Sequence, residues 1–148
     1  MATPRRPNPD RIIDAAMSLA AQSRWREVTL SNIAVEAKIS LVQLHEIFRS
    51  KSQIVAALVD RVDRAVFAET GVAVESEPIH DQLLDLLMRR LEELAPHKNG
   101  IASILRDTTC DPGTAICASI DMLRRMAWCL EAVGVGSAGV AGRVRTKG

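Results

Sequence analysis

The stretch "VTLSNIAVEAKISLVQLHEIFRSKSQI", residues 28–54, decides the fold of this chain. Thr29 suits the N-cap position of one helix, and Ser40 with Gln43 forms an S-x-x-Q capping box for the next. The second helix, residues 41–48, must therefore be short. Two short helices joined by a tight turn are typical of units that place their second helix in a DNA groove, so the stretch predicts a helix-turn-helix.

The rest of the chain also follows helical spacing. Asn8 can cap a first helix, and Ser50 with Gln53 repeats the capping box for the fourth. No run of residues alternates with period two, so no strand is expected and the fold class is all-α. Seven helices are expected. The first four are residues 9–22, a helix of about nine residues after Thr29, residues 41–48, and a helix that starts at Ser50 and continues past residue 60. The last three are residues 79–95, 100–107 and 112–134.

Composition excludes several classes of protein. The chain of 148 residues has 19 basic and 18 acidic side chains, so its net charge of +1 predicts no partner and a nucleic-acid surface would need local placement of charge. The three cysteines and three histidines lack metal-ligand spacing, so neither a metal site nor a cofactor is expected. Neither a signal peptide nor a membrane span is recognisable, and we expect a soluble, cytoplasmic protein.

Residues 9 to about 64 resemble the N-terminal DNA-binding domain of the TetR family of bacterial transcriptional regulators. The resemblance implies a helix-turn-helix domain over residues 9–54 that continues into the fourth helix to about residue 70. It also implies a helical ligand-binding body over residues 55–134, followed here by a glycine-rich basic tail at 135–148. The matching positions, found without a gap, are Ile13, Ala15, Ala16, Trp25, Thr29, Ile33, Ala34, Ile39, Ser40, Leu44, His45, Phe48 and Lys51.

The resemblance also implies a set of DNA contacts, with some departures. The family has glycine where this chain has Arg24 and Lys38, and a side chain in a left-handed turn costs about 1 kcal/mol. Leu41 stands where the family commonly has lysine and Val42 where it has a small residue, and both could at best touch a thymine methyl. The expected phosphate contacts are Thr29, Ser40, Arg49 and Lys51, and the expected base-edge contacts are Gln43 and His45.

The later part of the chain resembles the TetR-fold lipid-binding proteins that assist ubiquinone biosynthesis. The resemblance rests on "RLEELAPHKNGIASILRD", residues 90–107, and "PGTAICASIDMLRRMAWCLEAVG", residues 112–134. It implies an apolar ligand pocket in the helical body, although side chains at helical spacing also suit ordinary core packing. The candidate pocket residues are Leu84, Leu87, Met88, Leu91, Met122, Met126 and Trp128.

Two functions follow from these patterns. The first is a DNA-binding transcriptional regulator, a repressor, that acts on double-stranded DNA under the control of a small apolar ligand. The alternative is a lipid-binding accessory protein of ubiquinone biosynthesis that has lost DNA binding. TetR proteins form homodimers through further C-terminal helices that are missing here, so we expect either a fragment or a shortened protein that dimerises differently or not at all. No catalytic motif is present, and an enzyme is not expected.

Overall fold

The computed structural model describes residues 7–69 and 78–108, together with residues 112, 113, 116, 119, 120, 122–125 and 127. Every element in this described part is helical, which confirms the all-α prediction. The described residues between 112 and 127 are also helical, whereas the expected end of that helix near residue 134 and the tail at 135–148 lie outside the described residues. The elements are α1 (Pro9–Gln22), η1 (Trp25–Glu27), α2 (Leu30–Glu36), α3 (Leu41–Ile47), α4 (Lys51–Glu69), α5 (Ile79–Leu94), η2 (Ala95–His97) and α6 (Lys98–Thr108).

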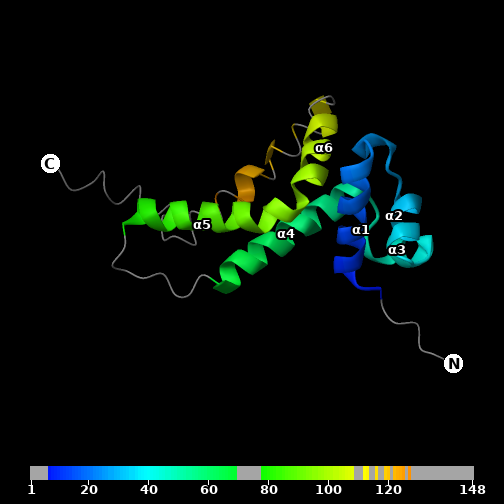
Figure 1. Ribbon diagram of the computed structural model, residues 1–148, viewed down its shortest axis with the longest axis horizontal. Coiled ribbons are helices and arrows are strands. Elements are labelled where there is room, and N and C mark those ends of the chain that lie inside the picture. The colour runs from blue at the N-terminus through cyan, green and yellow to red at the C-terminus, as the bar shows by residue number, and fades with distance from the viewer. Residues whose placement is uncertain are drawn as a thin grey trace.

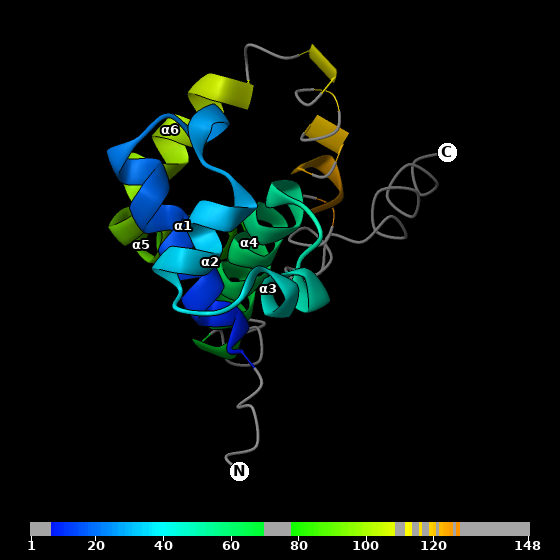
Figure 2. The same cartoon turned by 90° about the vertical axis from the view of Figure 1, so that its right-hand side faces the viewer.

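Helices α1, α2 and α3 form a unit at one end of the molecule (Figure 1). From this unit α4 leads away, α5 packs against α4, and α6 packs against α1 and the short η1 turn. The view down this end shows α2 and α3 on the outer side of the unit (Figure 2). The two short helices are therefore presented together at one surface.

Side-chain caps start the helices as the sequence predicts. The Asn8 side chain accepts a hydrogen bond from the Asp10 amide at 3.0 Å. Reciprocal bonds join Thr29 to Asn32, and in the second box the Ser40 hydroxyl accepts from the Gln43 amide at 3.1 Å. Because these bonds satisfy amides that a helix start leaves open, local sequence alone specifies where α2 and α3 begin.

The third box, at the start of α4, differs from the prediction. The Gln53 amide does donate to the Ser50 hydroxyl, at 3.3 Å. However, the Gln53 side chain accepts from the Arg49 amide at 2.7 Å instead of from the Ser50 amide. The box therefore reaches one residue further back and ties the link between α3 and α4 to the first turn of α4.

The two positions where the TetR family has glycine behave differently. Lys38 has φ of 57°, so the expected left-handed turn between α2 and α3 is confirmed. Arg24 has φ of −66° and ψ of 132°, so the expectation of a left-handed residue there is wrong. The chain leaves α1 in extended form at Ser23 and enters η1 directly, which needs no positive φ.

The described core lies mostly in the N-terminal unit and α4. All but two of its buried apolar side chains belong to residues 12–66; the exceptions are Leu86 of α5 and Ile104 of α6. Phe48 is 7% exposed, which confirms its expected burial. The largest of the fully buried side chains are Ile12, Ile13, Ile33, Leu44, Ile54 and Leu58.

Gly100 sets how closely α6 approaches α1. A Cβ atom added there would lie 2.9 Å from the Met17 carbonyl oxygen, which is shorter than a real contact of this kind. The backbone of α6 can therefore pass α1 only because this position has no side chain. The approach fixes α6 against the N-terminal unit.

Several expected boundaries shift by a few residues. Helix α2 has seven residues instead of about nine, because its chain turns at Lys38. Pro96 follows the end of α5 as expected, but it lies in η2, and α6 begins at Lys98, two residues earlier than predicted. None of the described helices is long and apolar enough to cross a membrane.

Candidate nucleic-acid interface

Helix α3 is held from one side and open on the other. Leu44 is completely buried and packs in the core with Ile33 and Phe48. Val42, two residues before Leu44 and so roughly opposite it around the helix, is 69% exposed, and Leu41 at the first helical position is 46% exposed. The packing therefore orients α3 so that its first turn is available to a partner.

Three of the expected DNA contacts are already used in the caps of the helices. The Thr29 hydroxyl accepts from the Asn32 amide at 3.1 Å and donates to the Asn32 side chain at 2.5 Å. The Ser40 hydroxyl caps α3, and the Gln43 side-chain oxygen accepts from the Ser40 amide at 3.0 Å. A phosphate or base contact by these groups would have to share or replace the capping bonds, so these roles stay predictions.

Lys51 has a structural position that its sequence motif did not indicate. Its ammonium group donates to the Trp25 carbonyl at 2.6 Å and the Val28 carbonyl at 2.8 Å, and it lies 4.8 Å from the centre of the Trp25 ring. Burial lowers the pKa of Lys51, and the Asp107 carboxylate partly opposes this shift. Two of the three N–H groups of the Lys51 ammonium bond to backbone carbonyls, so the main role of Lys51 is to join α4 to η1. Only the third N–H group is left for a phosphate contact.

Arg49 and His45 are the expected contacts that the structure leaves open to solvent. His45 is exposed in the last turn of α3, and Arg49 is exposed just beyond its end. Lys38, also exposed, lies in the turn before α3. The structure thus brings a cationic side chain to each end of α3, while α3 itself contains no Lys or Arg.

Residues of α6 also bond to η1 and to the residue before its N-cap. The Ser103 hydroxyl accepts from the Trp25 amide at 3.2 Å and donates to the Ser23 carbonyl at 3.1 Å. The Asp107 carboxylate accepts from the Arg26 amide at 2.7 Å. No local pattern could have revealed these contacts, since the partners lie 78 to 81 residues apart in sequence.

A second connection between the unit and the body centres on Arg61 of α4. Its guanidinium lies 2.9 Å from the Asp14 carboxylate and 3.6 Å from that of Asp10, both on α1. The same guanidinium meets the ring of His97 in η2 at 3.3 Å. Because Arg61 links three elements, it helps set the angle between α1 and α4.

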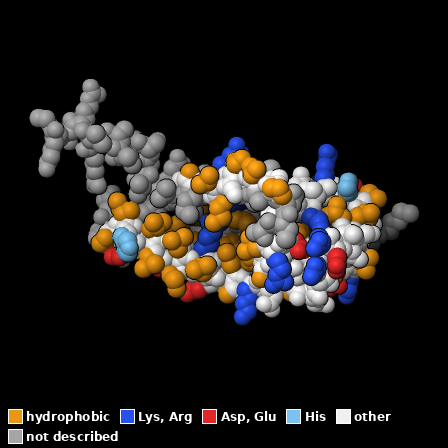
Figure 3. Space-filling model, turned by 90° about the horizontal axis from the view of Figure 1, so that it is seen from above, with side chains coloured by type: hydrophobic (Ala, Val, Ile, Leu, Met, Phe, Trp, Pro, Cys, Tyr) orange, Lys and Arg blue, Asp and Glu red, His pale blue; other side chains and the backbone are white. Residues whose placement is uncertain are grey.

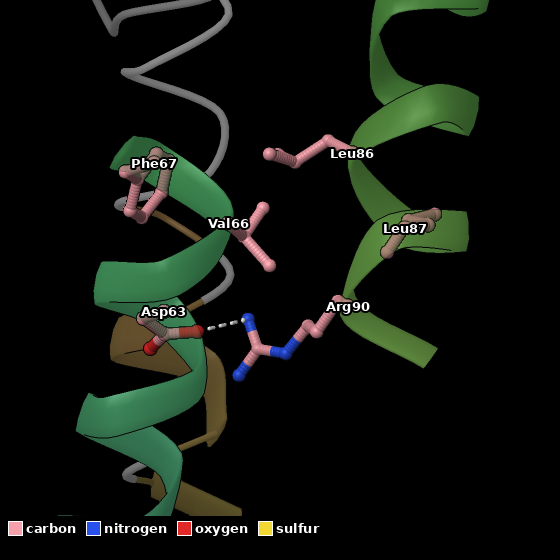
Figure 4. Close-up of a pocket in the computed structure, with 6 residues that line it drawn as sticks. All are labelled: Asp63, Val66, Phe67, Leu86, Leu87 and Arg90. Carbon is pink, nitrogen blue, oxygen red and sulfur yellow. Dashed lines mark ion pairs between the residues drawn. The ribbon is translucent and has the colours of Figure 1, made fainter. Parts of the chain in front are cut away.

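The described part of the body contains a small cavity between α4 and α5 (Figure 4). The cavity volume is about 10 Å³ when only the positions of a water molecule's centre are counted. A cavity of this size holds about one water molecule. An ion pair between Asp63 and Arg90, at 2.9 Å, closes one end. The lining residues are Asp63, Val66, Phe67, Leu86, Leu87 and Arg90.

The expected pocket residues are not assembled around this cavity. Leu87 lines it, but Leu84, Met88, Leu91 and Met122 are exposed. Hydrophobic side chains gather at the surface in the view from above, among them the exposed side chains of α5 (Figure 3). Since Met126 and Trp128 fall outside the described side chains, the larger pocket stays a prediction. Among the described residues, no group of three or more His, Cys, Asp or Glu could hold a metal ion.

Comparisons with known proteins agree with this geometry. Residues 12–58 match the family model of bacterial regulatory proteins, tetR family. The nucleoid occlusion factors SlmA of two Aliivibrio fischeri strains are 27% identical over 107 residues, which cover 71% of this chain and 55% of each relative. The chain thus spans about half the length of these curated relatives.

Two solved structures share the fold. A TetR transcriptional regulator from Nitrosomonas europaea is 27% identical with a TM-score of 0.72, covering 84% of this chain and 73% of that one. A TetR transcriptional regulator from a Rhodococcus species is 22% identical with a TM-score of 0.56, covering 84% and 68%. The second likeness concerns the fold alone. Each alignment covers 84% of this chain and so extends beyond the helix-turn-helix into the helical body.

Proposed function

We propose that this chain is a transcriptional regulator of the tetR family that binds double-stranded DNA through α3, because residues 12–58 match that family's model and the fold resembles that of a solved TetR regulator. The observation that carries the proposal is the presentation of α3. Leu44 anchors its inner side, and Leu41 and Val42 open its first turn to solvent. In helix-turn-helix units the N-terminal residues of this helix contact base edges in the major groove.

The charges around α3 support weak, position-specific DNA binding. Lys38 and Arg49 are exposed at its two ends and suit phosphates, while Glu36 and Glu46 are exposed on the same unit and would repel them. Since phosphate contacts supply most of the affinity for DNA, few net contacts imply a shallow dependence on salt. Lys51 acts here mainly by holding η1, and Arg49 is the better candidate for a phosphate contact.

The test is binding of the full-length protein to duplex DNA from its own promoter region across a salt series. We expect affinity to fall linearly with salt on logarithmic axes, and Arg49→Ala to reduce the slope by about 1. Arg64→Ala is the matched control, because Arg64 is exposed on α4 away from α3, and it should leave the slope unchanged. Absence of binding to any duplex at low salt would contradict the proposal.

We further propose that a small apolar ligand in the helical body controls DNA binding and that the regulator is a repressor. The support is the η1 turn, which is bonded both to α6 and to Lys51 of α4. A ligand that separates α4 from α5 would move α4, and η1 would carry that movement to α2 and α3. The described cavity would have to widen to admit such a ligand.

Ligand control can be measured on the purified protein. Native mass spectrometry should detect a co-purified apolar molecule, and removing it should change DNA affinity several-fold. Reporter expression should rise when the gene is deleted if the regulator represses. An unchanged affinity after removal, or no bound molecule at all, would argue against ligand control while leaving DNA binding intact.

We propose that the DNA-bound form is a homodimer, because two copies of α3 could then read half-sites about 34 Å apart. The mass of the protein–DNA complex in sedimentation measures this, and one copy per site would contradict it. The comparisons do not favour the alternative of a lipid-binding accessory protein in ubiquinone biosynthesis. Co-purified lipid together with an absence of DNA binding would revive that alternative.

A further inference from the structure

The first turn of α3 exposes two aliphatic side chains, whereas a helix that reads DNA usually exposes polar side chains there. Leu41 and Val42 occupy the first two helical positions and are exposed, and neither can donate or accept a hydrogen bond through its side chain. Single exposed apolar residues are common on proteins and need no partner. Their place matters here, because the start of the second helix of a helix-turn-helix lies nearest the base edges.

Gln43, the next residue of α3, already takes part in the cap at the start of the helix. A paired contact to adenine needs both the oxygen and the nitrogen of a carboxamide. The Gln43 side-chain oxygen accepts from the Ser40 backbone amide at 3.0 Å, and the Gln43 backbone amide donates to the Ser40 hydroxyl at 3.1 Å. Reading adenine with Gln43 would therefore compete with the bonds that start α3.

In the major groove the apolar group that distinguishes one base pair from the others is the C5-methyl of thymine. We propose that Leu41 and Val42 recognise thymine methyl groups, so that the preferred DNA site carries A·T pairs beneath the first turn of α3. This inference rests on the proposed DNA-binding function and specifies which bases that site takes.

The charges beside the apolar turn favour DNA over an apolar protein surface as its partner. Lys38 precedes α3 and Arg49 follows it, and both are exposed. A polyanion that runs past both ends of α3 would meet a cation at each end and the two carbon side chains between them. A purely apolar partner would leave Lys38 and Arg49, together with the exposed Glu36 and Glu46, facing carbon.

The experiment replaces thymine by uracil, which removes only the methyl group. A preferred duplex is first selected from random double-stranded DNA with the full-length protein, and uracil is then placed at one thymine at a time. We expect about a four-fold loss of affinity at one or two positions in each half-site, as for one buried methyl-sized group, and little change elsewhere.

Variants connect the effect to the two side chains. Leu41→Ala and Val42→Ala should bind the thymine and uracil duplexes within about 1.5-fold of each other at the positions that each residue reads. Val35→Ala is the matched control: Val35 is 77% exposed on α2, and its truncation should leave the four-fold discrimination in place. Alanine suits an exposed helical position, so the three variants should fold like the parent.

The outcomes separate this inference from the function on which it rests. A selected duplex that binds equally well with uracil at every position overturns thymine-methyl recognition and leaves DNA binding standing. Discrimination that survives in both Leu41→Ala and Val42→Ala also overturns the assignment. Failure to select any duplex at low salt overturns the proposed function and this inference together. If the two variants instead abolish self-association of the parent, the apolar turn is a protein interface.

Discussion

The N-terminal half of the described chain and helix α5 of the body differ in how far their apolar side chains are buried. Residues 12–66 supply all but two of the described buried apolar side chains, although Val35, Leu41 and Val42 are exposed. Helix α5 buries only Leu86 and exposes a stripe formed by Leu84, Leu87, Met88 and Leu91. These four lie at helical spacing on one face. The described core is therefore concentrated in residues 12–66, while the stripe on α5 stays mostly exposed.

The first way to break this comparison is Phe48→Ala, which should have the largest effect. A buried phenylalanine truncated in a small core costs about 3–5 kcal/mol, enough to unfold the unit at moderate temperature. Leu91→Ala is the matched control: Leu91 is 62% exposed, and its truncation should change stability by less than about 0.5 kcal/mol. Thermal unfolding followed by circular dichroism measures both. Similar melting temperatures for the two variants would show that the contrast between unit and body is wrong.

Gly100→Ala tests the point where unit and body meet. The added Cβ would press on the Met17 carbonyl, so we expect a loss of about 1–3 kcal/mol even though alanine favours helix. Asn99→Ala, at the exposed neighbouring position of α6, should be neutral or slightly stabilising. Chemical denaturation compares the two. A gain in stability for Gly100→Ala would mean that α6 can move away from α1 without cost.

Lys51→Met keeps most of the side chain but removes the ammonium that binds two carbonyls of the α1–α2 link. Losing charged hydrogen bonds to backbone should cost about 1–2 kcal/mol, and the cost should appear as loosening around η1. Hydrogen exchange at the Arg26 and Glu27 amides would report this loosening. Arg49→Ala is the contrasting variant, because it should weaken DNA binding and leave stability nearly unchanged. If Lys51→Met instead weakened DNA binding and left stability unchanged, Lys51 would act mainly as a phosphate contact.

Lys38→Gly sharpens the comparison within the unit and should have the smallest effect. Glycine adopts the observed positive φ without strain, so we expect a gain of up to about 1 kcal/mol. Lys38→Ala separates backbone from charge, since it removes the ammonium but keeps the strain and should bring no such gain. Equal stability of the two variants would show that the turn carries no measurable strain. Any fall in DNA affinity shared by both would report the lost charge.

The sequence predicted the local features well where one short segment suffices. The caps at Asn8, Thr29 and Ser40 were recognisable because each joins residues no more than three positions apart. The conformation of Arg24 was predicted wrongly, because a family glycine was taken as a sign of positive φ. The actual path of the chain into η1 is extended there.

The candidate site was predictable in outline and not in the roles of its residues. Spacing indicated α3 as the DNA-reading helix, and Phe48 as its buried anchor is confirmed. The resemblance to the TetR family assigned Lys51 to DNA, because a motif records which residue stands at a position and not which atoms surround it. Only packing brings the Trp25 and Val28 carbonyls to its ammonium.

The sequence by itself determined the all-α class, the helix starts and the short α3, because capping bonds and apolar periodicity act over a few residues. Tertiary structure alone decided how the unit joins the body. Ser103 and Asp107 bond to η1 from about 80 residues away, and Gly100 permits the close approach of α6 to α1. The physical reason is that such contacts depend on where whole helices lie in space. A chain's local preferences specify a helix, but only the packing of its faces selects the neighbours that its side chains meet.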